Sequence, residues 1–321
     1  MNDSTVFADT ARLPGRWARD VRVSFANGAI RSIEEGAAPR ARQTRVPLLL
    51  PGMTNLHSHA FQRAMAGLTE VAGAGDDDFW SWREWMYRFM ARIGPEDIEA
   101  IAAQLYVENL KLGVTSLVEF HYLHNDTDGS PYADRAETAL RIAAAARASG
   151  IALTLAPVLY SYGGFGRAPL SPAQRRFSTS VDDVLEIVNA LLPLADERLR
   201  VGIAPHSLRA SEVTQIRALV NGAPRSSSYI APLHIHASEQ TREVDECVAV
   251  TGKRPVRLLL DAVGLDARWC VVHATHLASD EVRDLAASGA VAGLCPSTEA
   301  DLGDGVFPFV EYASARGRFA R

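Results

Sequence analysis

LLLPGMTNLHSHAFQ, at residues 48–62, contains the clearest chemical signal in this chain. Three leucines open it, and two histidines, His57 and His59, follow with one residue between them. In a β-strand, residues i and i+2 point to the same face, so two imidazoles can reach one ion. The stretch therefore predicts a strand with a pair of metal ligands at its end.

Two later stretches supply the rest of such a site. LHIHASEQ at residues 233–240 contains His236 with Glu239 three positions on, and VVHATH at residues 271–276 contains His273. Imidazole ligands together with a spare carboxylate are what a hydrolytic zinc site needs. The three stretches together predict a metal-dependent hydrolase.

Composition restricts the class of protein. With 321 residues, of which 47% are hydrophobic, the chain can bury the core of one large domain or two ordinary ones. The net charge of −5 gives no basic field for nucleic acid. There is no apolar run of about 18 residues and no secretory signal, so we expect no membrane partner. Three cysteines without a CxxC pair indicate a reducing cytoplasm.

The chain divides into a β-rich start and an alternating remainder. Residues 1–47 contain VRVSF, the Asn27-Gly28 turn signal and AIRSIEE, a pattern typical of a hairpin. From residue 48 to 321, apolar strands alternate with amphipathic helices, which predicts an α/β fold with a parallel sheet. The predicted strands are 47–53, 114–121, 151–159, 200–205, 231–237, 268–274 and 290–295, and the main predicted helices are 95–112, 133–149, 181–195, 211–220, 253–264 and 279–288. This is seven strands, whereas a (β/α)₈ barrel needs eight.

The histidines of the chain gather at the ends of these predicted strands. All nine do so: His57, His59, His121, His124, His206, His234, His236, His273 and His276. A single histidine at a strand end is usually a packing residue, but nine are hard to explain that way. In a barrel the carboxyl ends of the strands meet on one face, where active sites form.

With these residues the chain resembles the amidohydrolase superfamily, and within it the deaminase branch. The resemblance covers essentially the whole chain and is nearest to the formimidoylglutamate (N-formimino-L-glutamate) deiminase family of histidine degradation. It rests on the order H-x-H, H-x-x-E, His and on the strings PGMTNLHSHAFQRAMAGLTE, DDFWSWREWMY, VEFHYLHND, APHSLRA, HIHASEQ and CPSTEADLGDG. It implies a (β/α)₈ TIM-like metal-dependent hydrolase barrel with a small N-terminal β-sandwich portion.

The resemblance also implies roles for particular residues. His57, His59 and His236 would ligate one Zn²⁺ per subunit, although imidazole and carboxylate also suit Fe²⁺ and Mn²⁺. Glu239 would shuttle protons, and His273 would sit beside the metal. The residues expected to bind substrate are Gln62, Arg83, Tyr122, His206 and Arg209.

The expected reaction is the hydrolysis of N-formimino-L-glutamate to N-formyl-L-glutamate and ammonia. The substrate is a small dianion, and guanidinium groups bind carboxylates bidentately, which suits the two arginines. A homodimer is the oligomeric state that such barrels commonly adopt.

The resemblance implies one further metal ligand, an aspartate at the end of an eighth strand. GVFPFVEYASARGRFAR, residues 305–321, ends where that strand is expected to begin. We therefore expect a C-terminally truncated form whose barrel lacks strand eight and whose activity is impaired. Asp301 and Asp304, which follow the seventh strand, are expected to be loop carboxylates at a Gly-containing turn.

Two alternative functions stay open. One is a deaminase of another amidine or of a purine-like ring, for which Trp80, Trp82 and Trp85 could supply stacking surfaces. The other is a remnant that binds zinc without turnover. His121, His124, His234 and His276 are expected to pack or to support the site rather than to ligate.

Overall fold

The computed structural model describes residues 4–27, 29–69, 79–226 and 229–320. Two compact units divide the chain, Met1–Met53 and Thr54–Arg321. The domain boundary expected after residue 47 stays a prediction. Gly28 and the ends of two quoted strings, Glu70 and Asp77-Asp78, lie outside the described residues.

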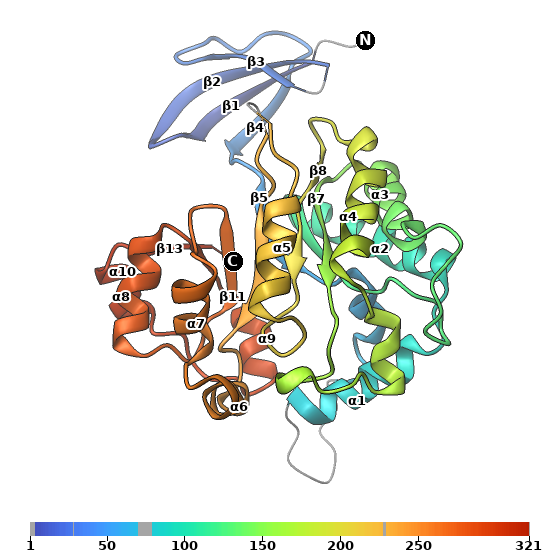
Figure 1. The fold of residues 1–321 in the computed structure, drawn as a ribbon. Coiled ribbons are helices and arrows are strands. Elements are labelled where there is room, and N and C mark those ends of the chain that lie inside the picture. The colour runs from blue at the N-terminus through green and yellow to red at the C-terminus, as the bar shows by residue number, and fades with distance from the viewer. Residues whose placement is uncertain (1–3, 28, 70–78, 227–228, 321) are drawn as a thin grey trace. The chain divides into compact units, whose positions relative to one another are not determined.

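The first unit contains one four-stranded sheet, in the order β3-β2-β1-β4 (Figure 1). Its strands are β1 Ser4–Leu13, β2 Arg16–Ala26, β3 Ala29–Glu34 and β4 Thr44–Leu49. The pairs β1–β2 and β2–β3 are antiparallel, and β4 runs parallel to β1. Small and branched residues, among them Ala8, Ala11 and Val21, are buried together in the core of this unit.

The strands of the second unit form two sheets of a curled barrel (Figure 1). The first contains β5 Met53–Ser58, β6 Val114–His121, β7 Ala152–Leu159 and β8 Leu199–Val201, with β9 Ala204–Pro205 beside β7. The second contains β10 Leu233–Ala237, β11 Trp269–His273, β12 Val291–Gly293 and β13 Arg318–Ala320. A parallel bridge between Ile203 and Leu233 joins the two sheets.

Helices follow the strands and cover the outside of this sheet (Figure 1). The α-helices are α1 Phe79–Met90, α2 Pro95–Lys111, α3 Glu137–Ser149, α4 Val181–Leu191, α5 Val213–Gly222, α6 Thr241–Thr251, α7 Pro255–Ala262, α8 Ser279–Ser288, α9 Pro296–Asp301 and α10 Phe309–Ser314. Short 3₁₀ segments are Ala60–Met65, Phe165–Arg167, Pro172–Phe177 and Leu192–Leu194. The α/β fold expected from the alternating pattern and the TIM-like barrel implied by the resemblance are confirmed.

One detail of the strand prediction was wrong. The expected strand 47–53 is two strands, β4 and β5, separated at Pro51-Gly52, because proline cannot donate to a sheet ladder. Where the eighth strand was expected to begin, the three residues of β13, Arg318–Ala320, pair parallel with β12, and no pairing with β5 closes the sheet among the described residues. Counting from β5, and taking β8 with β9 as one position, β13 is the eighth strand of the barrel.

Gly293 shows how closely the barrel strands approach one another. A Cβ atom at this position would lie 2.7 Å from the Sγ atom of Cys270 and 3.2 Å from Leu56 Cδ2. Leu56 belongs to β5 and Gly293 to β12, so the interiors of the first and seventh strands face each other. Only glycine leaves room for this approach.

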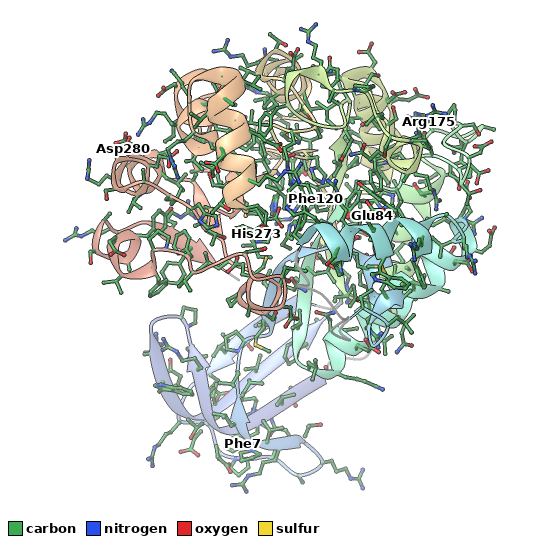
Figure 2. All side chains as sticks on the ribbon, turned by 90° about the horizontal axis from the view of Figure 1, so that it is seen from below. Phe7, Glu84, Phe120, Arg175, His273 and Asp280 are labelled. Atoms are coloured by element: carbon green, nitrogen blue, oxygen red, sulfur yellow. The ribbon has the colours of Figure 1, made fainter. Side chains whose placement is uncertain are left out.

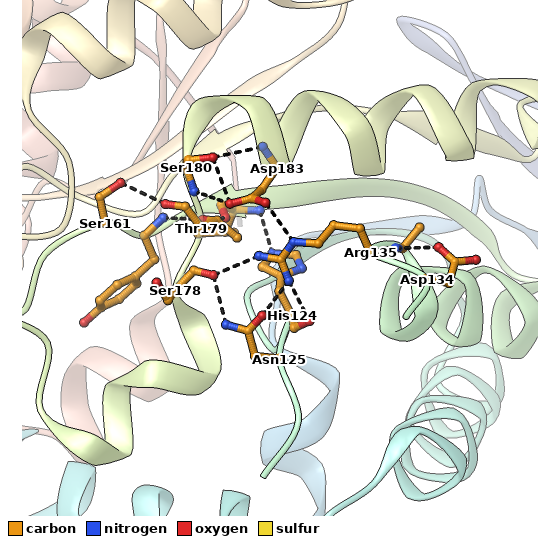
Figure 3. A network of polar contacts seen from close by, with 12 residues as sticks. His124, Asn125, Asp134, Arg135, Ser161, Ser178, Thr179, Ser180 and Asp183 are labelled. Atoms are coloured by element: carbon orange, nitrogen blue, oxygen red, sulfur yellow. Dashed lines mark hydrogen bonds and ion pairs between the residues drawn. The ribbon is translucent and has the colours of Figure 1, made fainter. Parts of the chain in front are cut away.

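A polar network anchors the loop after β6 to the start of α4 (Figure 3). Arg135 donates to the Asp183 carboxylate over 2.9 Å and to the carbonyl of Ser178 over 3.1 Å. The Nε2 atom of His124 accepts the backbone N–H of Val158 over 3.2 Å. These bonds attach the loop after β6 to the end of β7 and to the start of α4.

Because His121 is buried, we expect the stability of the fold to decrease at acidic pH. Burial lowers its pKa from 6.5 to about 3, and its ring bonds Thr138 Oγ1 over 3.0 Å. Between these two pH values the unfolded chain binds a proton that the folded chain does not, so the free energy of unfolding falls as pH falls below 6.5. At pH 5 this one group lowers it by about 2 kcal/mol relative to pH 7.

The variant His121→Gln is therefore expected to lose less stability between pH 7 and pH 5 than the parent chain, by about 2 kcal/mol. Urea unfolding of both chains at the two pH values measures this difference. An equal loss in both chains would mean that His121 does not titrate on unfolding.

Within the described residues, none of the helices combines the length and the apolar character that a bilayer-spanning segment requires.

Candidate functional site

All ten residues predicted for the site line one cavity of about 180 Å³ in the second unit. They come from β5, the loop after it, α1 and the carboxyl ends of the later strands. Figure 2 shows Phe120 and His273 toward the middle of this unit, with Arg175 and Asp280 at its periphery. The barrel topology thus collects residues separated by more than 200 positions in the chain, although their individual roles stay predictions.

Three imidazoles converge at the floor of the cavity. The Nε2 atom of His57 lies 3.0 Å from Nε2 of His59 and 3.0 Å from Nε2 of His236. His57 comes from β5 and His236 from β10, on opposite sheets of the barrel. One ligand atom from each of the three residues can reach a single ion.

Backbone carbonyls decide which nitrogen of two of these rings carries hydrogen. His59 Nδ1 lies 3.0 Å from the carbonyl of Phe120, and His236 Nδ1 lies 3.2 Å from the carbonyl of His206. A carbonyl only accepts, so Nδ1 donates in both rings and Nε2 presents a lone pair. Lone pairs that face one another repel unless a cation lies between them, and carbonyl-oriented imidazoles are typical of metal ligands. The donor set therefore fits a divalent metal.

Burial keeps these histidines neutral. It lowers the pKa of His59 to about 4 and the pKa values of His57 and His236 well below 6.5, and neighbouring histidines lower the latter two further. Neutral imidazole is the form that binds metal. The site is thus prepared to accept a cation at neutral pH.

Glu239 lies at the centre of the polar contacts above this cluster. It follows β10 in the loop before α6, and only 4% of its surface is exposed. Its Oε1 atom lies 3.5 Å from His273 Nε2, and its Oε2 atom lies 3.4 Å from Arg209 Nη2. A carboxylate so placed can exchange a proton with a group in the cavity.

The two predicted arginines lie around the same aromatic ring. The Cζ atom of Arg209 is 5.5 Å from the ring centre of Phe79, and that of Arg83 is 6.0 Å from it. The Nε atoms of both arginines are buried and have no hydrogen-bond partner among the described residues. Two guanidinium groups with spare donors suit a ligand with two carboxylates.

The remaining predicted residues form one polar wall. Gln62 Nε2 donates to the hydroxyl of Tyr122 over 3.0 Å. His206 Nδ1 lies 3.1 Å from Ser207 Oγ, and its ring centre lies 5.0 Å from that of His236. Burial, followed by the charge of Arg209, lowers the pKa of His206 well below 6.5, so this side chain is neutral in the cavity.

Sequence reasoning did not place three buried carboxyl groups near the site: it left out Glu119 and Glu299, and it expected Asp304 in a loop. Glu119 on β6 accepts the backbone N–H of Ala60 over 2.7 Å, and burial raises its pKa to about 8. Glu299 on α9 and Asp304 beyond it each have a carboxylate oxygen within 4.8 Å of a ring nitrogen of His273. Burial and the charge of Glu239 raise the pKa of Asp304 to about 7. A single glutamate inside the apolar strand VTSLVEFH was the signal for Glu119.

Asp304 differs most from its expected character. It does lie in a loop beside Gly305, but only 3% of its surface is exposed, whereas Asp301 is exposed on α9. Its carboxylate accepts a hydrogen bond from the side chain of Gln240. The sequence pattern of a turn did not indicate that this turn folds into the barrel mouth.

The secondary histidines lie outside the ligand cluster. His121 and His124 bond within the core, and His276 Nε2 bonds the carbonyl of Asp304 over 2.7 Å. His234 shares the strand β10 with His236 but lines a separate hollow beside Leu56 and Cys270.

Comparison with known proteins identifies the class. A model described as the amidohydrolase family matches residues 48–319, and the chain belongs to this family of metal-dependent hydrolases that act on carbon–nitrogen bonds. A second model, described as formimidoylglutamate deiminase HutF, N-terminal domain, matches residues 3–45.

The relatives add detail to this assignment. Formimidoylglutamate deiminase of Pseudomonas aeruginosa is 52% identical over 98% of this chain and 69% of its own length. A crystal structure of an amidohydrolase from Brucella melitensis is 46% identical, with a TM-score of 0.92 over 99% of this chain and 70% of that one. An adenosine deaminase from Xanthomonas campestris with bound zinc has a TM-score of 0.75 at 21% identity, over 99% of this chain and 68% of that one, which shows the shared fold.

Proposed function

We propose that this chain is a formimidoylglutamate deiminase that hydrolyses N-formimino-L-glutamate to N-formyl-L-glutamate and ammonia in histidine degradation. The observation that carries the proposal is the pair of guanidinium groups around Phe79, in the cavity that also contains the three-histidine cluster. The 52% identity to the Pseudomonas enzyme supports the same substrate.

We propose Zn²⁺ as the metal, one per subunit, held by His57, His59 and His236. Three nitrogen ligands suit zinc, and the zinc in the related adenosine deaminase fold supports this choice over Fe²⁺ or Mn²⁺. When bound, the metal supplies Lewis acidity that acidifies water and polarises the substrate. The homodimer and the cytoplasmic location expected above remain proposals.

The residues of the chain then divide the work of hydrolysis. Glu239 takes a proton from the attacking water and gives it to the nitrogen that leaves as ammonia. The oxygen of the water adds to the formimino carbon, and the C=N bond to the terminal nitrogen becomes a single bond as that nitrogen takes the first proton. The second proton of the water then moves to the same nitrogen through Glu239, the C–N bond breaks, the formyl C=O bond forms and ammonia leaves. His273, 3.5 Å from Glu239, orients the attacking oxygen, and Gln62, Tyr122 and His206 support the substrate beside it.

Arg209 and Arg83 hold the two carboxylates of the substrate in this scheme. Arg209 is 9% exposed and already pairs with Glu239 over 3.4 Å. A substrate carboxylate would take up the remaining donors of its guanidinium group, including the unpaired Nε. The contact also couples substrate binding to the position of the proton-transferring carboxylate.

Arg209→Ala is expected to weaken substrate binding by ~1.5–3 kcal/mol, the loss of a charged hydrogen bond, which raises KM roughly 10- to 100-fold. Steady-state kinetics measure this change. Arg257→Ala, which removes a surface arginine paired with Asp280 and Asp284, serves as the control and should leave KM unchanged. An unchanged KM in the Arg209 variant would contradict its role.

A purine-type deaminase is the second candidate, because Phe79, Tyr160 and Phe177 also line the cavity. Calorimetric titration of the zinc-loaded chain with N-formimino-L-glutamate, and separately with adenosine and guanine, separates the two. Ammonia release is measured in parallel, with the Pseudomonas enzyme as the positive control. Binding and turnover of the linear substrate support the proposal, and binding of a purine alone would overturn it.

A further inference from the structure

His273 is held between two carboxyl groups, and the proposed reaction uses only one of them. Its Nε2 atom lies 3.5 Å from Glu239 Oε1, and its Nδ1 atom lies 3.2 Å from Glu299 Oε1. His273 is 3% exposed and Glu299 is 5% exposed, so water does not compete for either contact. Glu299 is absent from the cavity lining, and a substrate in the cavity would not touch it.

The carboxylate of Glu299 is itself fixed in place. The Oε1 atom that faces His273 also accepts the backbone N–H of Cys295 over 2.8 Å. The backbone N–H of Glu299 donates back to the carbonyl of Cys295 over 2.9 Å. These two bonds attach the side chain to the first turn of α9, so the oxygen that meets the imidazole has one position.

A fixed acceptor at Nδ1 determines that this nitrogen carries a hydrogen. A carboxylate only accepts, so Nδ1 must carry the hydrogen, and Nε2 is then the nitrogen that faces Glu239 and the cavity. The backbone of His273 has φ +66°, and that of Ala274 has φ +49°, a region that costs free energy for residues other than glycine. The imidazole of His273 therefore starts from a strained backbone turn, and a hydrogen-bond partner at Nδ1 stabilises its orientation.

We propose that Glu299 is a positioning residue that fixes the tautomer and orientation of His273 for the hydrolytic reaction. The inference rests on the proposed function, in which His273 orients the attacking oxygen. Glu299 itself lines neither the cavity nor the three-histidine cluster, so it acts on the reaction through the imidazole of His273, while its bond to the backbone N–H of Cys295 keeps the carboxylate in place.

The variants Glu299→Ala and Glu299→Gln test this role. Alanine removes the acceptor, whereas the amide oxygen of glutamine can still accept from Nδ1–H and from Cys295. We expect kcat to fall about 10- to 100-fold in the alanine variant, as for other partners that orient a site histidine, with KM unchanged. The glutamine variant should recover part of this loss.

Glu281→Ala is the matched control. Glu281 is also fully buried and also caps a short helix, through the N–H of Ala278 over 2.8 Å, but it bonds Arg254 and no site residue. If this variant loses kcat as Glu299→Ala does, the effect of Glu299 is one of stability alone, and the proposal fails.

The tautomer of His273 gives a reading that does not depend on turnover. Nitrogen-15 NMR of the histidine-labelled chain should show Nδ1–H for His273 in the parent and in Glu299→Gln, and a mixture in Glu299→Ala. An unchanged tautomer in the alanine variant overturns the inference even when the parent enzyme is active. If the substrate assignment fails instead, this spectrum still decides whether Glu299 determines the tautomer of His273.

Discussion

Loss of the metal and of all measurable turnover is expected for His57→Ala. His57 Nε2 lies 3.0 Å from both other ligand nitrogens, so its removal takes away the central member of the cluster. Loss of a residue that only orients a ligand already costs 10–100-fold in metal affinity, and loss of the ligand itself is expected to cost more than about 10²-fold. Metal content by mass spectrometry after dialysis measures the effect.

His234→Ala is the matched control for this experiment. His234 is a strand histidine too, and it is buried, but it lines a separate hollow and is not a member of the cluster. This variant should keep one metal per chain. Full metal content in His57→Ala would mean that the three-histidine cluster does not hold the ion.

A fall in kcat of at least about 10²-fold, with the metal retained, is expected for Glu239→Gln. The amide keeps the size of the side chain and can still contact Arg209, but it cannot accept the proton of the attacking water. Because the metal ligands are all histidines in this proposal, metal content should not change. Ammonia release and metal analysis on the same preparation measure both quantities.

Glu246→Gln on α6 provides the comparison, because Glu246 pairs with the exposed Arg242 and lies outside the cavity. Its turnover should equal that of the parent. Near-normal turnover in Glu239→Gln would remove Glu239 from the mechanism and direct attention to Asp304, the other carboxyl group of the Glu239–His273–Asp304 cluster.

The strands could be predicted because their signal is local. An apolar run such as VTSLVEFH or WCVVH is buried wherever it lies in a parallel sheet, so its periodicity is enough to find it. The short β13, with the sequence RFA, has no such signal and forms because β12 offers it a free edge. That pairing depends on a partner about 27 residues earlier, which a local pattern does not contain.

The ligand residues could be predicted for a similar reason. The H-x-H spacing determines that both rings leave one strand end together, and the resemblance to a family assigned the distant partners. Glu299 and Asp304 had no comparable signal, because a glutamate in a helix and an aspartate at a turn are ordinarily exposed. Only the fold of the loop after β12 onto His273 made them buried members of the site.

The sequence by itself determined the α/β class, the pair of ligands after the first barrel strand, and the family to which the chain belongs. The tertiary structure decided which imidazole nitrogens face the cavity, because the carbonyls of Phe120 and His206 bind the other nitrogen of each ring. It also decided which carboxyl groups are buried away from water. The physical reason is that side-chain direction along a strand follows from the short-range geometry of the backbone. Tautomers and desolvation depend instead on contacts between residues that are distant in the chain.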